Sequence, residues 1–282
     1  MRTGITTRMK LWVSVGAFSL VQAGQSVMEI EHLVGVTMPL TGNAALAADI
    51  KSGGEGGEGG EGGEAGIDAA AAATDPVVYR TALAVIDAHY RAGIDAYEVG
   101  VKDIATAMFF HPIAEVYVEL EAVLTERGVA SFRSSMERSG ELAGAGADTA
   151  TVVAAAGQVL EATAAAARSA PEDGRSPAAV EAALLTELID RAARQYAVAV
   201  EDPELEPYLD GYGLARAVKH EAQIGMPSVM ASSAAAGEAI EAALALVAQA
   251  YPGPERPREL KVVPEELLAA ATSVRFATSR VR

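Results

Sequence analysis

The spacing of apolar residues after residue 75 constrains the fold more than any other feature of the chain. Between residues 83 and 97, apolar side chains recur every three or four positions, at Leu83, Ile86, Tyr90, Ile94 and Tyr97. This interval matches the 3.6-residue period of an α-helix and places the side chains on one face. The segment therefore predicts an amphipathic helix that packs against other helices.

The composition agrees with a helical fold. About half of the 282 residues are apolar, many of them alanine, whereas aromatic residues make up 5%. Alanine has the highest intrinsic helix propensity, and aromatic residues favour strands. VGVTM and VYVEL resemble short strands, but the second lies inside a helical pattern. We predict an all-α fold: an antiparallel helical bundle, organised as two packed helical units, with a disordered N-terminal region.

Capping signals predict where the first helices begin and end. Asp75 with Pro76, and Ser176 with Pro177, pair an N-cap residue with a proline suited to the first helical turn. We expect the first helix to end at Gly100. A second short helix is predicted over 101–110, and a third is predicted to begin at His111-Pro112 and to end near residue 128. Later helices are predicted over 149–170, from residue 176 onward, and over 208–224 and 228–251.

These signals divide the chain into five parts. They are a leader over 1–47, a Gly/Glu-rich flexible linker over 48–74, an N-terminal helical unit over 75–140, a C-terminal helical bundle over 141–255, and a tail over 256–282 with a possible last helix beginning at Val263-Pro264. The boundary between the helical units rests on residues 139–147, which are rich in glycine and alanine. Residues 53–64, GGEGGEGGEGGE, predict a solvated tether, with weak trapping of cations as the alternative.

The N-terminus has the layout of a secretory signal peptide. Three basic residues precede an apolar run over residues 11–23, and small residues suit cleavage after Ala23 or, alternatively, after Ala47. The run is shorter than the roughly 20 residues that span a bilayer. We expect an exported, periplasmic protein with no membrane span in the mature chain.

Charge and missing motifs exclude several function classes. The net charge of −16 and the pI near 4.7 argue against binding of nucleic acid, which needs clustered lysine and arginine. The absence of cysteine excludes disulfides and thiolate metal sites. The chain has no phosphate-binding loop, no zinc-protease helix motif and no glycine-bracketed serine nucleophile. We therefore expect a protein that is not an enzyme.

His111 is the first candidate metal ligand. At the start of the third predicted helix, it would share one stripe with Glu115 and Glu119, which follow four and eight residues later. An imidazole and carboxylates on one stripe can bind a borderline divalent or a ferric ion. The competing interpretation is that these glutamates form a solvated face opposite the apolar stripe.

His89 is the second candidate, on another helix. Small residues such as Gly93 near it would let a second helix approach, which would place the imidazole in a groove between helices. The alternative is a buried histidine with satisfied hydrogen bonds. If the helices fold back on one another, His89 and His111 converge, and Met108 adds a thioether. A thioether selects copper(I), whereas carboxylates prefer iron, zinc or manganese. Iron is the leading candidate, with zinc and copper as alternatives.

Two segments and the tether resemble a protein family. With GGEGG, the segments LAVIDAHYRAGIDAY and AMFFHPIAEVYVEL resemble a group of uncharacterised exported proteins of proteobacteria. In that group a histidine in the first helix is followed by His-x-x-His-Pro, an acidic residue and tyrosine. The matching residues are His89, His111, Glu115 and Tyr117, and Met108 stands in the place of the first histidine of the pair.

The second half carries a further resemblance. LLTELIDRAARQYAVAVEDPELEPYLDGYGLARAV, about 35 residues, is similar to the extracytoplasmic helical region of high-affinity iron permeases and, more distantly, to imelysin-type iron-uptake proteins. The latter carry His-x-x-Glu, whereas His111 and Glu115 lie one residue further apart. The resemblance implies metal binding linked to iron uptake, with a membrane permease or another envelope protein as partner. The alternative function is a metal-free envelope adaptor that binds a protein partner.

Overall fold

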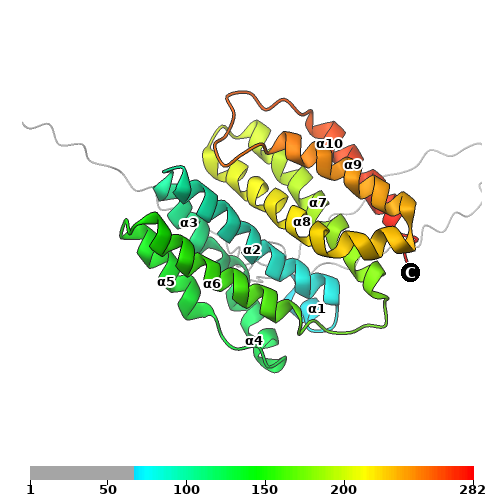
Figure 1. Cartoon of the computed structure of the whole chain (residues 1–282), viewed down its shortest axis with the longest axis horizontal. Helices are drawn as coiled ribbons and strands as arrows, with labels where there is room; N and C mark the ends of the chain where they lie inside the picture. The colour runs from blue at the N-terminus through cyan, green and yellow to red at the C-terminus, as the bar shows by residue number, and fades with distance from the viewer. Residues whose placement is uncertain (1–66) are drawn as a thin grey trace, which may run out of the picture. The chain divides into compact units, whose positions relative to one another are not determined.

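The chain is described here by a computed structural model of residues 67–282, which is helical throughout (Figure 1). No strand occurs in this range, so the predicted all-α fold is confirmed. The predicted signal peptide and most of the tether lie outside the described residues. The elements are α1 Ala69–Ala72, α2 Pro76–Glu98, α3 Lys102–Pro112, the π-helical turn η1 Ile113–Tyr117, α4 Val118–Glu126, α5 Arg133–Gly144, α6 Thr149–Ala167, α7 Pro177–Glu201, α8 Leu205–Ser232, α9 Ala234–Ala250 and α10 Pro264–Thr278.

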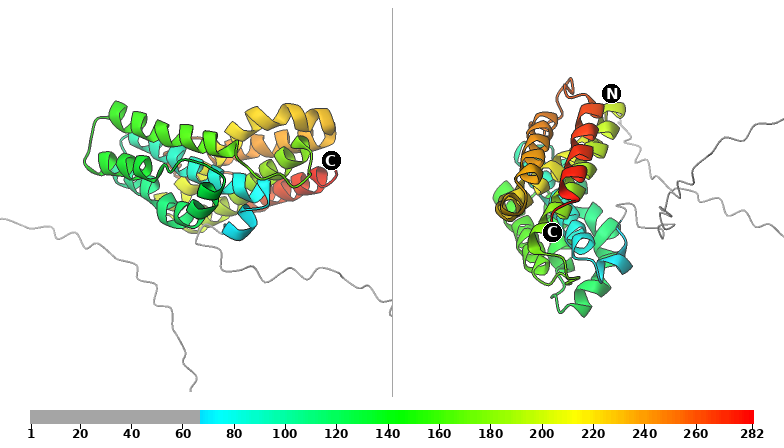
Figure 2. Two further views of the ribbon diagram at one scale, coloured as in Figure 1. Left: turned by 90° about the horizontal axis from the view of Figure 1, so that it is seen from below. Right: turned by 90° about the vertical axis from the view of Figure 1, so that its right-hand side faces the viewer.

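Helix α2 lies between two groups of helices. The first group is α3 to α6, and the second group is α7 to α10. Helix α2 packs against α3 and α6 of the first group and against α7 and α8 of the second. Figure 2 shows the cyan and green helices of the first group beside the yellow to red helices of the second. The predicted boundary at 139–147 falls between α5 and α6, which both belong to the first group. The chain passes from the first group to the second in the loop 168–176. Helix α6 stays in the first group because its apolar face packs on α2 and α5.

The folded chain begins earlier than the predicted linker allows. Asp68 caps α1 by accepting a hydrogen bond of 3.0 Å from the backbone N–H of Ala71. Ile67 and Ala72 are buried, and α1 packs against α2 and α4. The linker therefore does not extend to residue 74. Ile67 and Ala72 pack in the hydrophobic core, and the sequence of this segment alone does not indicate this packing.

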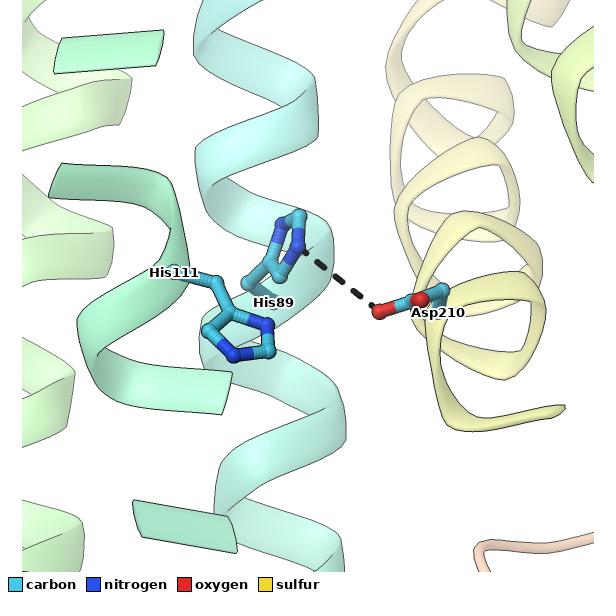
Figure 3. A group of neighbouring side chains, drawn as sticks. All are labelled: His89, His111 and Asp210. Carbon is cyan, nitrogen blue, oxygen red and sulfur yellow. Dashed lines mark ion pairs between the residues drawn. The ribbon is translucent and has the colours of Figure 1, made fainter. Parts of the chain in front are cut away.

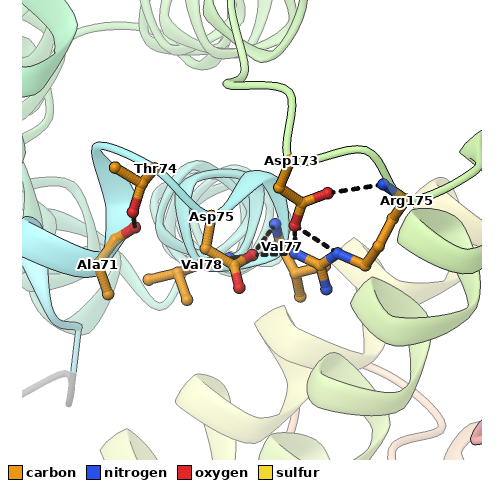
Figure 4. Close-up of polar contacts among 7 residues, drawn as sticks. All are labelled: Ala71, Thr74, Asp75, Val77, Val78, Asp173 and Arg175. Atoms are coloured by element: carbon orange, nitrogen blue, oxygen red, sulfur yellow. Dashed lines mark hydrogen bonds and ion pairs between the residues drawn. The ribbon is translucent and has the colours of Figure 1, made fainter.

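Asp75 caps α2 as predicted and also holds a distant loop (Figure 4). Its Oδ1 accepts hydrogen bonds from the backbone N–H of Val77 at 2.7 Å and of Val78 at 3.3 Å. The same oxygen accepts a bond of 2.6 Å from Arg175, whose guanidinium is oriented by Asp173. One carboxylate thus satisfies the exposed end of α2 and joins it to the loop before α7.

Tyrosines join the alanine-rich helices to one another. All eight are at most 5% exposed, and each hydroxyl hydrogen-bonds to a residue outside its own helix, in another helix or in a loop. Tyr90, for example, donates to the carbonyl of Phe109 in α3, and Tyr251 donates to the carbonyl of Ala192 in α7. Because alanine buries little area, these rings supply both apolar area and a directional bond at each helix contact.

An ion-pair network joins α2, α7 and α8. Arg80 donates to both carboxylate oxygens of Glu181, at 2.6 and 3.2 Å, and to Glu221 at 2.9 Å. The three side chains are 15–17% exposed. Burial raises the pKa of Glu221 although Arg80 opposes the rise. Removal of Arg80 would leave Glu181 and Glu221 partly buried without a cation, so the network favours the packing of α7 and α8 on α2.

Helices α10 and α6 relate to the predicted tail helix and to the predicted absence of a membrane span. Helix α10 begins at Pro264 as expected for the tail. Helix α6 is long and apolar enough to cross a membrane by length and composition alone, a criterion that core helices of globular proteins also meet. One face of α6 packs on α2, and Thr163 in that face donates a hydrogen bond of 3.1 Å to Asp87.

Candidate metal centre

Three helices bring one potential metal ligand each to a common point. His89 lies on α2, His111 on α3 and Asp210 on α8, and Figure 3 shows their side chains converging. One ligand atom from each residue lies within 4.8 Å of the others. The two imidazole rings meet edge to face, with centroids 6.3 Å apart. The predicted convergence of His89 and His111 therefore occurs, with Asp210 as a third member.

The backbone fixes which nitrogen His89 presents. Its Nδ1 lies 2.9 Å from the carbonyl oxygen of Val85, one turn earlier on α2. A carbonyl only accepts hydrogen bonds, so Nδ1 carries the proton and Nε2 is left with its lone pair in the neutral ring. Nε2 faces Glu115 Oε2 at 3.6 Å and Asp210 Oδ1 at 3.8 Å. This nitrogen thus points at two acceptors, which attract it only through a proton or a metal ion.

Pro112 shapes the segment that carries His111. The prediction that a new helix begins at His111 is wrong, because α3 continues through Pro112 and is followed directly by η1 and α4. Proline lacks the N–H that an α-helix needs at this position and its ring crowds the preceding turn. The chain widens into a π-helical turn, in which Val118 N–H bonds to the carbonyl of Ile113, five residues back.

The π-helical turn directs Glu115 towards both histidines. Besides its contact with His89, Glu115 lies 3.9 Å from Nδ1 of His111, and its side chain is 23% exposed. The interpretation of a plain solvated face is therefore wrong for Glu115. Glu119 is exposed one turn later on α4. Neither glutamate belongs to the three-residue cluster, although Glu115 contacts both of its histidines. Met108 is fully buried in the hydrophobic core.

Asp210 is the one acid of the three-residue cluster. Its Oδ1 is buried and has no hydrogen-bond partner among the described residues. Burial raises the pKa of Asp210 to about 7, the carboxylates of Glu206 and Glu115 add to the rise, and His111 opposes it. A buried carboxylate oxygen without a partner is costly in free energy, so this position favours a proton or a cation.

Glu206 forms the outer edge of the cluster. It lies one turn before Asp210 on α8, and its Oε1 is 3.5 Å from Nε2 of His111. Its side chain is 47% exposed, against 11% for His89. The exposure of these side chains therefore increases from the imidazole of His89, which is largely buried, to the carboxylate of Glu206 at the solvent boundary.

Two glycines allow the three helices to approach. A Cβ added to Gly93 of α2 would lie 2.6 Å from the ring of Phe109, two residues before His111. A Cβ added to Gly213 of α8 would lie 2.4 Å from the carbonyl oxygen of Ala88, the residue before His89. The predicted role of Gly93 in admitting a second helix is confirmed. Gly213 is the equivalent position for the approach of α8.

The cluster opens into a cleft of about 470 Å³ between α2, α7 and α8. Its lining includes Val85, His89, Glu115, Arg191, Asp210 and Leu214. A metal ion and a few solvent ligands can therefore reach the cluster from outside. The volume is within the range of about 300–1,000 Å³ that is usual for ligand sites.

The spacing of the donors suits a transition metal after small side-chain movements. Ligand atoms bound at about 2.1 Å to a tetrahedral ion lie about 3.4 Å apart. In the three-residue cluster, His89 Nε2 and Asp210 Oδ1 lie 3.8 Å apart, and the ligand atoms of all three residues lie within 4.8 Å of one another. Side-chain rotations that move each ligand atom by about 1 Å would bring the donor atoms to the spacing of bound ligands. The carbonyl of Val85 already orients the His89 ring through Nδ1, as backbone carbonyls do for many metal-binding histidines.

Sequence patterns did not indicate Asp210 or Glu206 as metal ligands. Asp210 lies within Tyr208–Gly213, where its neighbours are aromatic, apolar or glycine. A single carboxylate among such residues was the only sequence feature that could have indicated a buried ligand. This feature alone does not tell which helix the carboxylate faces.

Comparisons of the chain with protein-family models, with curated protein sequences and with solved structures found no match.

Proposed function

We propose that the protein binds one transition-metal ion through His89, His111 and Asp210, with Glu115 as a further donor. One observation carries the proposal: the lone pair of His89 Nε2 faces Asp210 Oδ1 at 3.8 Å, and this oxygen has no hydrogen-bond partner among residues 67–282. Two acceptors repel each other unless a cation lies between them. A metal ion satisfies both, because it accepts the nitrogen lone pair and neutralises the carboxylate.

The donor set favours iron, with zinc second. Two imidazoles with one carboxylate and open positions are typical of non-haem iron(II) sites, and the same atoms suit zinc. Copper(I) prefers sulfur donors, and the thioether of Met108 lies in the apolar core. The open cleft beside Asp210 leaves room for further ligands on the ion.

The proposed role is to bind and pass on the metal. A site that opens into a cleft, with the half-exposed Glu206 beside His111, lets the ion enter and leave without unfolding. The signal-peptide pattern and the resemblance to iron-uptake proteins support a periplasmic protein that delivers iron to a permease. We therefore propose metal handling in the periplasm, in iron uptake.

A proton in place of the metal is the competing state. His89 as an imidazolium ion would form ion pairs with Glu115 and Asp210 at the same positions. The bundle would then be an adaptor without metal. The two states differ in whether the purified protein takes up a stoichiometric metal ion.

Metal titration of the apo-protein tests the proposal. We expect one iron(II) ion per chain under anaerobic conditions, and one zinc ion in a parallel titration, by calorimetry and by metal analysis after dialysis. His89→Ala and His111→Ala should each weaken binding about 100-fold or more, because each removes a direct ligand. His220→Ala is the matched control, since His220 lies on α8 outside the cluster. Stoichiometric binding by both cluster variants, or none by the wild type, would contradict the proposal.

A further inference from the structure

A second cleft lies between α8 and α9. Its volume is about 900 Å³, and its walls are one face of α8, the facing side of α9 and Arg91 of α2. Figure 1 shows α8 and α9 side by side as an antiparallel pair, in yellow and orange. None of the three residues of the metal cluster lines this cleft. It is therefore a separate site from the metal centre.

Basic residues outnumber acidic residues in the lining of this cleft, which is the reverse of the balance in the whole chain. The chain has 38 acidic and 22 basic residues. The cleft lining instead holds four basic side chains, Arg91, Arg216, Lys219 and His220, and one acidic residue, Glu241. A local positive field in an acidic protein selects a small anion, because a large polyanion would meet the negative charge of the surrounding surface.

Some of this positive charge is available to a ligand. Arg91 uses its Nε on Asp87 at 2.7 Å, and Arg216 uses one terminal nitrogen on Asp95. Lys219 is exposed and has no ion pair with any residue of the described chain. Lys219 is thus the cation that a ligand can reach, with Arg216 one turn before it on the same face of α8.

Most of the other lining residues are apolar, with the exposed Gln223 and two tyrosines, Tyr212 and Tyr251, among them. Helix α8 contributes Ala222 and Met226, and α9 contributes Leu244, Val247 and Ala248 at helical spacing along one side. Met226 and Leu244 are half-buried, so the bundle leaves part of their surface open. A polar anion such as sulfate would not cover this area, whereas an alkyl chain would remove it from water.

We propose that the α8–α9 cleft binds a linear alkyl carboxylate of medium chain length. The carboxylate is placed at Lys219 and Arg216, and the alkyl chain lies along Met226 and Leu244. The volume suits such a ligand, since sites for small molecules usually measure about 300–1,000 Å³. The lining combines basic residues with apolar side chains, which matches a ligand that has one charged end and an alkyl chain.

Calorimetry with three small ligands tests both halves of the proposal. Dodecanoate should bind the full chain, whereas acetate, which has no chain, and dodecanol, which has no charge, should each bind at least about tenfold more weakly. Lys219→Gln should weaken dodecanoate binding about fivefold to tenfold and leave dodecanol binding unchanged. Lys261→Gln, an exposed lysine outside the cleft, is the matched control and should bind as the wild type does.

A second variant tests the apolar wall. Ala245→Glu places a carboxylate at an exposed position of α9 in the cleft lining and should weaken dodecanoate binding at least about tenfold. His111→Ala should bind dodecanoate as the wild type does, which separates this site from the metal site. Equal affinity for dodecanoate and dodecanol, unchanged binding by Lys219→Gln, or no binding of dodecanoate by the wild type would overturn the proposal.

Discussion

Gly213→Ala is expected to destabilise the fold by about 2–3 kcal/mol, the upper part of the range for overpacking, and to weaken metal binding at least tenfold. The added Cβ would lie 2.4 Å from the carbonyl oxygen of Ala88, which belongs to the backbone of α2 and cannot rotate away. Helix α8 must therefore move from α2. This movement separates Asp210 from His89, which follows Ala88 directly.

Urea unfolding and zinc titration of the same preparation measure both effects of Gly213→Ala. Gly157→Ala is the matched control, because Gly157 lies in α6 and an added Cβ there meets no atom within 4 Å. The control should gain up to about 1 kcal/mol from the higher helix propensity of alanine, with unchanged metal affinity. A Gly213→Ala protein with wild-type stability and wild-type affinity would show that this approach of α8 does not position the site.

Asp210→Asn is expected to stabilise the metal-free protein at pH 8 while removing its response to metal. The unfolded chain releases the Asp210 proton near its ordinary pKa of about 3.9, whereas the folded chain holds it up to about pH 7. The folded state therefore binds more protons between these values, and the wild type loses stability as the pH rises from 4 through 7. Asparagine carries no charge, so the variant avoids this cost, which is on the order of 4 kcal/mol at pH 8 because the pKa differs by about three units between the two states.

Urea unfolding with a chelator at pH 8 and at pH 4.5 measures this difference. The gain of the variant over the wild type should be large at pH 8 and small at pH 4.5, and zinc should stabilise only the wild type. Glu161→Gln, an exposed acid on α6, is the control and should show no pH-dependent gain. If Asp210→Asn is less stable than the wild type at pH 8 without metal, Asp210 is a structural partner of an imidazolium ion instead of a metal ligand.

Local patterns were sufficient to predict most of the fold. The apolar stripe from Leu83 to Tyr97 is the buried face of α2, and Asp75 and Ser176 cap the helices they were expected to cap. Pro112 shows where local rules end. Proline is compatible both with the first turn of a new helix and with a π-helical turn inside a longer one. Packing of α3 and α4 on their neighbours decides between the two, and this packing is not visible in the local sequence.

The candidate site was only partly predictable. His89 and His111 were separated by 22 positions on neighbouring helices, and Gly93 indicated a close helix contact, so their convergence could be expected. Asp210 lies 121 positions after His89, and its contribution depends on the rotation of α8 about its axis. Met108 was a plausible donor by proximity in sequence, but it lies on the same face of α3 as the buried Ala105 and Phe109. The sequence spacing does not distinguish a donor that faces the cluster from one that faces the core.

An anomalous-difference map of the iron- or zinc-loaded crystal tests the central claim most directly. Data collected at the absorption edge of the metal should show one peak per chain, at about 2.0–2.2 Å from His89 Nε2, from a ring nitrogen of His111 and from Asp210 Oδ1. A peak at other residues, or no peak at the cluster in protein saturated with metal, would contradict the assignment of His89, His111 and Asp210 as the metal site.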